Sequence, residues 1–455
     1  MLMSRPLTLR PRPWSALPVI LVPVFVTTLD FFIANVAMPS IRADLGSGSA
    51  GTQLVTAAYG LAYAAGLLIS GRLGDVYGAR RMFVLGLALF TLASVLCGVA
   101  PSMPALIAAR VLQGSAAAIL SPQVLTLLGA AYRGPDRKRA FGWYGTATGL
   151  AGISGQVIGG LLVSADLGGL GWRACFLLNL PIGVATLAMT RLLPELPSGP
   201  DSVLPSGRRG RVDVVGAALV AGGLTALVMP FVLGPELGWP GWVWLPVVAA
   251  VPLLTAFGHR QRSGEVEPLL DLGVFLAPGF VAGLAGVALL FASSAGLSFV
   301  LALYLQDGAG MSPVSAAAIF TSLNAGFFAA SLRAPRRPLT GALLLAGGLC
   351  ALVVVIGSGL PYLLVGCLLV AGAGMGALMS PLIAGTLAGV RPERAGAAAG
   401  VLGTVQEAGG VLGGTVAGAA LLGSLDHGWD VAGRAGAVVV AVFALGVLVV
   451  VARRR

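Results

Sequence analysis

Three ionisable side chains lie inside long apolar stretches of this sequence, and they are Asp30, Arg110 and Glu407. A charge near the centre of a bilayer costs about 2.5–3.5 kcal/mol on insertion scales, and ionisable residues there mark functional sites by default. Burial favours the neutral form of a carboxylate, whereas a nearby arginine favours the ionised form. A carboxylate in such a place can bind and release a proton. We therefore predict that these three residues couple proton movement to the function of the chain.

Purely structural roles for the same residues stay open. Asp30 and Arg110 can form a buried ion pair that acts only in packing. Arg110 also lies close enough to one end of its stretch to extend toward lipid headgroups. Asp30 has a shorter reach and stands well inside its stretch. Of the two carboxylates, Asp30 is therefore the better candidate for a protonation site.

The sequence carries no set of residues typical of an enzyme. Its two histidines, His259 and His427, fall in predicted loops on opposite sides of the chain. The glycine-rich runs lack the lysine of a phosphate-binding loop. The four cysteines stand in apolar stretches without the spacing of metal ligands. We expect no catalytic residue, no metal site and no cofactor, so an ion or substrate gradient must supply the driving force.

Polar side chains within the apolar stretches are candidates for contact with a small-molecule ligand. Binding cavities are mostly apolar and place a few polar groups at chosen points. The predicted cavity residues are Asn35, Tyr59, Tyr63, Gln113, Gln123, Asn179, Asn324 and Gln406.

The composition indicates that the apolar stretches cross a membrane. Of 455 residues, 57% are hydrophobic and 10% are charged, whereas about a quarter of a soluble domain is charged. A span needs about 20 apolar residues, and this rule predicts an all-α protein with fourteen membrane helices. The spans cover roughly residues 15–38, 52–70, 82–99, 104–131, 139–163, 172–191, 214–233, 242–258, 278–304, 312–331, 339–356, 361–389, 396–422 and 434–452.

Positive charge alternates from one loop to the next. One set of loops carries nearly all the arginines, and the other set is rich in carboxylates and holds only Arg42, Arg173 and Arg434. Because basic loops stay in the cytoplasm, we predict a multi-pass protein of the cell membrane with both termini in the cytoplasm. The formal net charge of +11 then reflects topology, and no nucleic acid partner is expected.

Two longer polar segments divide the predicted helices into groups of six, two and six. Both segments are rich in residues that favour loops and linkers. The predicted organisation is a six-helix bundle at 1–191, a cytoplasmic linker at 192–213, two extra helices at 214–258, a cytoplasmic loop at 259–277 and a second six-helix bundle at 278–455.

A charged, glycine-punctuated loop is predicted between the second and third spans. Its glycines permit a tight reversal, and its carboxylate can approach the positive end of a neighbouring helix. A solvated turn that only fixes topology is the alternative. The residues predicted to gate the cytoplasmic side are Gly71, Asp75, Gly78, Arg80 and Arg81.

Small residues crowd the fifth predicted span. Glycines at such spacings let another helix approach closely. Ordinary tight packing is one interpretation, and a sliding or rocking interface between bundles is the other. The residues concerned are Gly152, Gly155, Gln156, Gly159 and Gly160.

Six segments carry motifs that are specific when taken together: Leu29–Pro39, Gly71–Arg81, Arg110–Gly114, Gly155–Gly160, Gly171–Gly183 and Tyr304–Pro313. They resemble motifs of the fourteen-span drug:proton antiporters within the major facilitator superfamily. The segment Gly71–Arg81 resembles the signature loop between helices 2 and 3 of that superfamily. Two departures are Val76 and Ala79, where the family often has arginine, and a third is Gln156 in place of the usual proline.

The resemblance implies two six-helix bundles around a central cavity, with alternating access and two extra central helices. It implies proton-coupled export of drugs, antibiotics or similar amphipathic small molecules, with Asp30 as the proton-linked acid and Arg110 as its electrostatic partner. Asp75 and the loop arginines would latch the cytoplasmic side, and the fifth-helix glycines would form a hinge or seal. The partners expected are the substrate, protons and the lipid bilayer, with the chain acting as a monomer.

Two other functions stay open from the sequence. One is export of a specific metabolite, siderophore or monovalent cation by the same fold. The other is a membrane sensor that transports nothing, which the membrane-embedded carboxylates and the absence of an output domain disfavour. The residue types do not identify the substrate, the proton stoichiometry or the role of the two extra helices.

Overall fold

The computed structural model describes residues 14–193, 213–262, 272–331, 338–391 and 395–453, without the side chains at 49, 68, 71, 72, 75, 138, 153, 272 and 395–397. Throughout these ranges the regular structure is helical. The first half holds α1 (Ala16–Leu45), α2 (Ser49–Tyr77), α3 (Ala79–Gly98), α4 (Met103–Ala131), α5 (Gly134–Ala165), α6 (Arg173–Leu177) and α7 (Asn179–Ala188). It is followed by α8 (Val214–Leu237), α9 (Leu245–Arg262), α10 (Phe280–Leu303), the π-helix η5 (Tyr304–Gly308), α11 (Pro313–Ser331), α12 (Pro338–Val355), α13 (Pro361–Leu387), α14 (Ala395–Leu422) and α15 (Trp429–Arg453).

Eleven helices in the described ranges are long and apolar enough to cross a membrane. Three predicted spans are not among these eleven, and each coincides with helical structure. Two of them are α2 and α14, with 29 and 28 residues. The third, predicted at 172–191, is divided into α6 and α7 at Leu178. The membrane character of the fold is confirmed, and the number fourteen stays a prediction.

Local sequence signals account for several helix ends. Gly46 ends α1 in the left-handed conformation, with φ 60°, and Gly238 ends α8 with φ 68°. Proline stands in the first turn of α4, α5 and α13, where a missing N–H costs nothing. Asp213 accepts a hydrogen bond from the Gly216 N–H and so caps α8.

The sequence predicts a loop between the second and third spans, and the structure shows helix over most of that segment instead. Helix α2 continues through Gly71 and Asp75 to Tyr77, and α3 begins at Ala79. Gly78 alone connects them, at φ 91°, a conformation that glycine adopts without strain. Close contact fixes the extension, because Gln123 of α4 donates to the Ser70 carbonyl at 2.8 Å and lies against Gly74.

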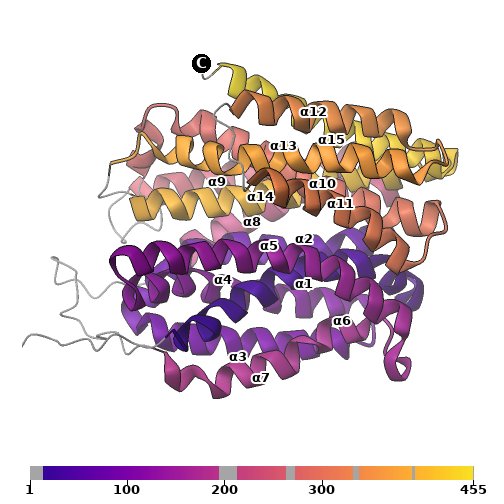
Figure 1. Ribbon diagram of the computed structural model, residues 1–455. Helices are drawn as coiled ribbons and strands as arrows, with labels where there is room; N and C mark the ends of the chain where they lie inside the picture. Colours follow the sequence, from indigo (N-terminus) through magenta and orange to yellow (C-terminus); the bar gives the residue numbers. More distant parts are fainter. Residues whose placement is uncertain (1–13, 194–212, 263–271, 332–337, 392–394, 454–455) are drawn as a thin grey trace, which may run out of the picture.

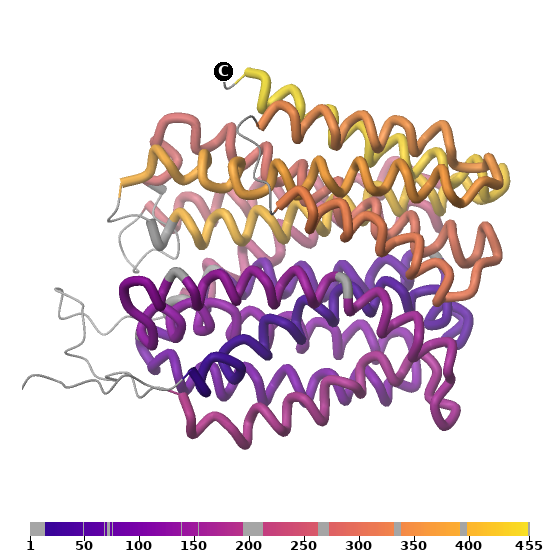
Figure 2. Tube along the Cα trace, in the orientation of Figure 1, coloured from indigo at the N-terminus to yellow at the C-terminus, as the bar shows by residue number. Residues whose placement is uncertain are grey.

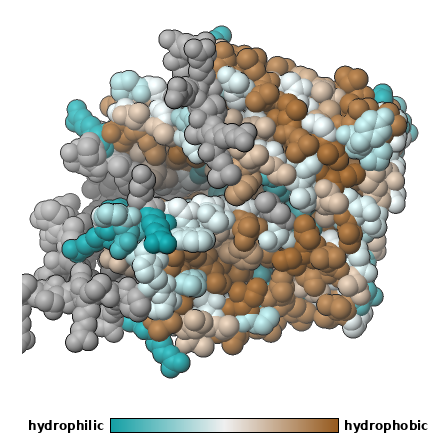
Figure 3. Space-filling model, in the orientation of Figure 1, coloured by the Kyte–Doolittle hydropathy of each residue, from teal (hydrophilic) through white to brown (hydrophobic). Residues whose placement is uncertain are grey.

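The two halves of the chain form two helical layers that face each other (Figure 1). The trace in Figure 2 shows α1–α7 in indigo to magenta on one side and α10–α15 in orange to yellow on the other. Each half has its own core: Phe83 and Phe176 are fully buried in the first, and Val300 and Val440 in the second. Hydrophobic side chains cover much of the outer surface in Figure 3, as expected for contact with lipid.

The two bundles meet along two antiparallel helix pairs, α2 with α14 and α5 with α11. Helix α1 also touches α10, and α8 packs on both α2 and α14. Helices α1, α3, α5, α8 and α10 all run toward one end of the molecule, which we call the Asp44 end. The opposite end, where α2 ends and α3 begins, is called the Arg80 end.

The bundles are tied together at the Asp44 end in this structure. Gln306 of η5 donates to the Val36 carbonyl of α1 at 3.1 Å, and Arg42 pairs with Asp307 at 3.6 Å. Toward the Arg80 end, Gly142, Gly145 and Gly149 of α5 have open space where a side chain would stand. Among the described residues, no polar contact between α1–α7 and α10–α15 lies nearer that end than Ala64 with Thr404.

Candidate functional site

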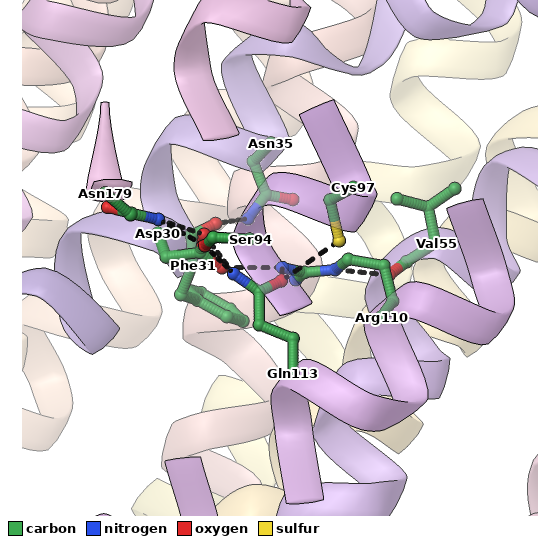
Figure 4. A network of polar contacts seen from close by, with 9 residues as sticks. All are labelled: Asp30, Phe31, Asn35, Val55, Ser94, Cys97, Arg110, Gln113 and Asn179. Atoms are coloured by element: carbon green, nitrogen blue, oxygen red, sulfur yellow. Dashed lines mark hydrogen bonds and ion pairs between the residues drawn. The ribbon is translucent and has the colours of Figure 1, made fainter. Parts of the chain in front are cut away.

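Asp30 and Arg110 form an ion pair inside the first bundle (Figure 4), with 2.5 Å between Arg110 Nη1 and Asp30 Oδ2. Both side chains are 0% exposed. Gln113 Nε2 donates to Asp30 Oδ1 at 2.8 Å, and Asn179 Nδ2 donates to the same oxygen at 3.0 Å. Asp30 thus receives three donors from two helices, a set that suits an ionised carboxylate.

Four helices deliver these groups to one point. Asp30 comes from α1 and Asn179 from the start of α7. Arg110 and Gln113 stand three residues apart on α4, so they share one face of that helix. Ser94 of α3 lies behind them and accepts from both Gln113 Nε2, at 2.7 Å, and Asn179 Nδ2, at 2.8 Å.

Helix α2 holds the arginine from the other side. Arg110 Nε donates to the Val55 carbonyl at 3.1 Å, and the guanidinium carbon lies 4.3 Å from the centre of the Tyr59 ring. Tyr59 in turn lies 6.0 Å from Tyr63, with the rings nearly parallel. Arg110 therefore does not adopt the alternative of extending to the headgroups, because its buried charge is compensated by Asp30, a carbonyl and a π-face.

Two polar atoms of this network lack a partner in the described part of the chain, Arg110 Nη2 and Asn179 Oδ1. Both are buried, and an unpaired buried polar atom is costly. Arg110 Nη2 is a donor and Asn179 Oδ1 is an acceptor, so the network could still donate one hydrogen bond and accept another. A site that changes its protonation state needs such capacity to rearrange its hydrogen bonds.

Glu407 is placed elsewhere, on the seam between α2 and α14. It stands three residues after Thr404 and four before Val411. Thr404 bonds to the Ala64 carbonyl of α2 at 3.5 Å, and Val411 fills the space beside Gly60. Because residues three and four apart share a helix face, Glu407 lies on the face of α14 that contacts α2, near Tyr63. In the described part of the chain, its partly buried carboxylate makes no hydrogen bond or ion pair.

Most of the predicted cavity residues are buried inside the first bundle. Gln113 and Asn179 belong to the Asp30 network, and Gln123 bonds to α2. Asn35 donates to the Phe31 carbonyl within α1, at 2.8 Å. In this structure these four side chains bond to other residues of the first bundle, and their role in lining a cavity stays a proposal. Tyr63, Asn324 and Gln406 are partly exposed, and Tyr59 is 4% exposed against Arg110.

The glycines of α5 serve two different contacts. A Cβ on Gly155 or Gly159 would come within 2.8 Å of Phe32 or Ile33, so these glycines allow α5 to lie against α1. Gly152 faces the Phe32 ring in the same contact. Gly160 instead faces the Pro313 carbonyl of α11 in the other bundle.

Gln156 lies on the side of α5 that faces the second bundle. It lines a small cavity together with Gln306, Val36 and Phe320, and this cavity is hardly larger than one water molecule. A hinge or seal role for α5 stays a proposal.

The segment predicted to gate the Arg80 end is only partly described. The side chain of Asp75 and position 71 lie outside the described side chains. Arg80 donates to the Thr190 carbonyl at 3.3 Å, so it joins α3 to the segment after α7. Arg81 is exposed. These contacts lie within the first bundle.

Sequence reasoning missed several residues of the site. Ser94 and Cys97 of α3 both contact Gln113, and Val55 supplies a backbone oxygen. Single serines and cysteines in an apolar helix carry little signal, and a backbone carbonyl carries none. Gln306 belongs to a motif of the sequence, and no role was predicted for it. In the structure its amide donates to a backbone carbonyl of α1.

Comparison with known proteins assigns the chain to a family. The sequence profile of the Major Facilitator Superfamily matches residues 20–414. This chain belongs to the Major Facilitator Superfamily. As a superfamily member it is a membrane transporter and not an enzyme.

Several superfamily relatives are named for antibiotic export or resistance. The probable actinorhodin transporter of Streptomyces coelicolor is 42% identical over 92% of this chain and 73% of its own length. Puromycin resistance protein pur8 of Streptomyces alboniger is 37% identical over 97% of this chain and 90% of the relative. The cephamycin export protein CmcT of Amycolatopsis lactamdurans is 34% identical over 86% of this chain and 81% of the relative.

Solved structures share the fold at low sequence identity. A peptide transporter POT in complex with sulfate aligns with a TM-score of 0.65 and 16% identity, over 97% of this chain and 95% of that chain. The xylose transporter XylE from E. coli aligns with a TM-score of 0.63 and 14% identity, over 95% of each chain. These likenesses support the superfamily fold along nearly the whole chain.

Proposed function

We propose that this transporter exports drugs, antibiotics or similar amphipathic small molecules in exchange for protons, by alternating access. The observation that carries the coupling is the fully buried Asp30–Arg110 pair, held by Gln113 and Asn179. The names of the relatives support the class of substrate. Alternating access is supported by the polar contacts that tie the bundles at the Asp44 end and by the open space beside Gly142, Gly145 and Gly149 toward the Arg80 end.

The coupling step follows from the charges around Asp30. While Arg110 stays in contact, protonation of Asp30 would leave the guanidinium without its counter-ion, which is costly in a buried site. A movement of α4 against α1 weakens that contact, and an isolated buried carboxylate then takes up a proton. Each charge moved across the membrane adds about 2.3 kcal/mol per 100 mV, enough to bias this step.

We propose that the Asp44 end faces the outside and the Arg80 end the cytoplasm, with fourteen spans and both termini inside. The positive-inside rule supports this orientation, because Arg80, Arg81, Arg133 and Arg137 gather at one end. Reporter fusions at Arg208 and Arg455 should both report the cytoplasm. An external signal at either position would contradict the fourteen-span topology.

The position of Glu407 supports the proposal that this transporter prefers cationic substrates. Its carboxylate is partly buried and unpaired in the described part of the chain, and the stacked pair Tyr59 and Tyr63 lies across the seam. A carboxylate beside aromatic faces suits an organic ammonium group. At the Arg80 end, we propose that Asp75 and the neighbouring arginines latch the bundles in the opposite state.

Transport into inverted membrane vesicles tests the proposed function. With an acidic lumen, addition of ethidium or puromycin should release lumenal protons, and a proton ionophore should abolish accumulation of either compound. Vesicles without the protein provide the control. Accumulation that continues at its full rate after the ionophore would exclude proton-coupled export.

A further inference from the structure

The two extra helices join both bundles at one seam. Helix α8 packs on α2 of the first half and on α14 of the second. Near the Asp44 end, Val228 and Val232 form a buried cluster with Leu61 of α2 and Val411 of α14. Nearer the Arg80 end, Val220 belongs to the core of the second half. Helix α8 therefore packs against both α2 and the second bundle along the seam, and it lies between the two layers (Figure 1).

A carboxylate of α8 caps α2 at the Asp44 end. The Glu236 Oε1 atom accepts the Ala50 N–H at 2.8 Å. The first turn of α2 has no cap of its own, because Gly48 at its N-cap has no side chain. Glu236 thus satisfies one of the N–H groups left unpaired at a helix start and places a negative charge at the positive end of the dipole.

One buried amide links three helices just below that cap. Gln53 of α2 is 2% exposed. With its amide turned to satisfy its surroundings, it donates to the Phe231 carbonyl of α8 at 3.3 Å and to the Thr415 carbonyl of α14 at 3.1 Å. The α2–α14 contact at this level therefore includes α8.

The hairpin of α8 and α9 is also fixed at its far end. Asp213 pairs with Arg260 at 2.8 Å and accepts from Gln261 at 3.2 Å, which ties the start of α8 to the end of α9. At the Asp44 end, Trp239 and Trp244 stack at 5.8 Å. A hairpin fastened at both ends moves as one piece.

We propose that the α8–α9 hairpin is a strap that holds the Asp44 end closed, and that Glu236 is the residue it must release when this end opens. Opening this end separates α2 from α14. The Gln53–Thr415 bond joins these two helices directly, whereas the Gln53–Phe231 and Glu236–Ala50 bonds join α2 to α8 and break when α8 stays with α14. The inference concerns only the balance of two conformations. It rests on the proposed alternating access and is independent of the proposed proton coupling and substrate.

Cysteine labelling of the purified protein in detergent tests the strap. Ala317 of α11 is 3% exposed and lies against Gly160 in the other bundle seam, so Ala317→Cys reports opening. Cys350 and Cys367 are replaced by serine, and the buried Cys97 and Cys175 remain. Glu236→Ala should raise the rate of maleimide labelling roughly tenfold, which corresponds to about 1.4 kcal/mol in the closing equilibrium.

Two variants separate the strap from a general loosening of the fold. Glu236→Gln keeps an oxygen that accepts the Ala50 N–H, so labelling should stay near the parent rate. Asp166→Gly removes a carboxylate that accepts the Gly171 N–H within the first half, at 2.7 Å, and should also leave the rate unchanged. Equal labelling of Glu236→Ala and the parent would overturn the proposal, as would an equal rise in Asp166→Gly.

A disulfide provides a second measurement if Glu236→Ala folds poorly. A Cβ on Gly48 would lie 3.0 Å from the Glu236 Cδ, so Gly48→Cys with Glu236→Cys places two thiols within reach of each other. Oxidation should block labelling of Ala317→Cys and reduction should restore it. Undiminished labelling with the disulfide formed would show that the Asp44 end opens without releasing the strap.

Discussion

Asp30 and Glu407 are both carboxylates inside apolar helices, and the structure gives them opposite surroundings. Asp30 is 0% exposed and accepts from Arg110, Gln113 and Asn179. Glu407 is partly exposed on the seam between the bundles and has no hydrogen-bond or ion-pair partner among the described residues. The charge of Asp30 is compensated by neighbouring side chains in the absence of a ligand, whereas the charge of Glu407 is not compensated by any described residue.

This difference suggests separate roles for two carboxylates for which the sequence predicts the same role, proton coupling. A compensated charge inside one bundle responds to movements of that bundle, because the hydrogen-bond network around it joins α1, α3, α4 and α7. An uncompensated charge on the seam responds to whatever enters the seam. We infer that Asp30 serves proton coupling and that Glu407 serves recognition of the substrate, with a proton as its substitute when no cation is bound.

Removal of the arginine should have the largest effect. Arg110→Met leaves Asp30 buried without its counter-ion, and loss of one partner of a buried pair costs about 3–5 kcal/mol. We expect a large drop in the midpoint of thermal unfolding, measured in detergent by loss of the monodisperse peak. Arg110→Lys should recover only part of the stability, since an ammonium cannot reach Asp30, Gln113 and the Val55 carbonyl together.

A double-variant cycle checks that this loss belongs to the pair. Asp30→Asn with Arg110→Met should be more stable than Arg110→Met alone, because no charge is left unpaired. Glu407→Gln is the matched control and should leave the unfolding midpoint near the parent value. Additive losses in the double variant would contradict the coupling of the two charges.

Glu407→Gln should change the choice of substrate. Uptake of ethidium into inverted vesicles should fall on the order of tenfold, equivalent to about 1.4 kcal/mol, while uptake of a neutral compound changes little. The reason is that the amide keeps the shape and loses the charge that attracts an ammonium group. A loss of equal size for cationic and neutral compounds would place Glu407 in the coupling step.

Gln113 should tune the proton site. Gln113→Met removes one donor from Asp30, so the pH dependence of export should change. Gln123→Met is a matched change on the same helix, also buried, at a side chain that bonds to the Ser70 carbonyl. Both variants should lose about 1 kcal/mol of stability, and only Gln113→Met should move the pH profile. An equal shift in both variants would contradict a direct role.

The smallest effect is expected at Asp213, outside the spans. Burial opposes its ionised form, but hydrogen bonds from Gly216, Arg260 and Gln261 outweigh burial and lower the pKa of Asp213. A lowered pKa means that this carboxylate stabilises the fold above the usual aspartate range and ceases to do so as the pH falls below it. Asp213→Asn should reduce the unfolding midpoint at pH 7, and the difference should shrink as the pH falls below the usual aspartate range.

The fold was largely predictable because a bilayer imposes a simple rule. Apolar length placed nearly every helix, although α1 and α8 continue past the predicted ends, to Leu45 and Leu237, where Gly46 and Gly238 stop them. The exception was Gly71–Arg81, where glycines and charges predict a loop. Contact with Gln123 keeps α2 helical to Tyr77, and such a contact between distant residues leaves no local trace in the sequence.

The site was predictable in its charges and not in its geometry. The free-energy cost of a charge in a membrane helix identified Asp30, Arg110 and Glu407 as candidates. The structure shows that Gln113 and Asn179 donate to Asp30, and the sequence did not predict these bonds, because an amide in an apolar helix looks the same whether it faces a cavity or a carboxylate. Glu236 and Gln53 were missed, since their partners are backbone atoms of other helices.

Substrate-induced proton release in Asp30→Asn tests the central claim most directly. The parent, Asp30→Asn and Glu407→Gln are placed in matched inverted vesicles with an acidic lumen, and a lumenal pH probe and labelled puromycin are followed together. We predict proton release in the parent, a reduced but proton-linked signal in Glu407→Gln, and no proton release in Asp30→Asn even where puromycin still binds. Full proton release in Asp30→Asn would contradict the assignment and move the coupling site away from the buried pair.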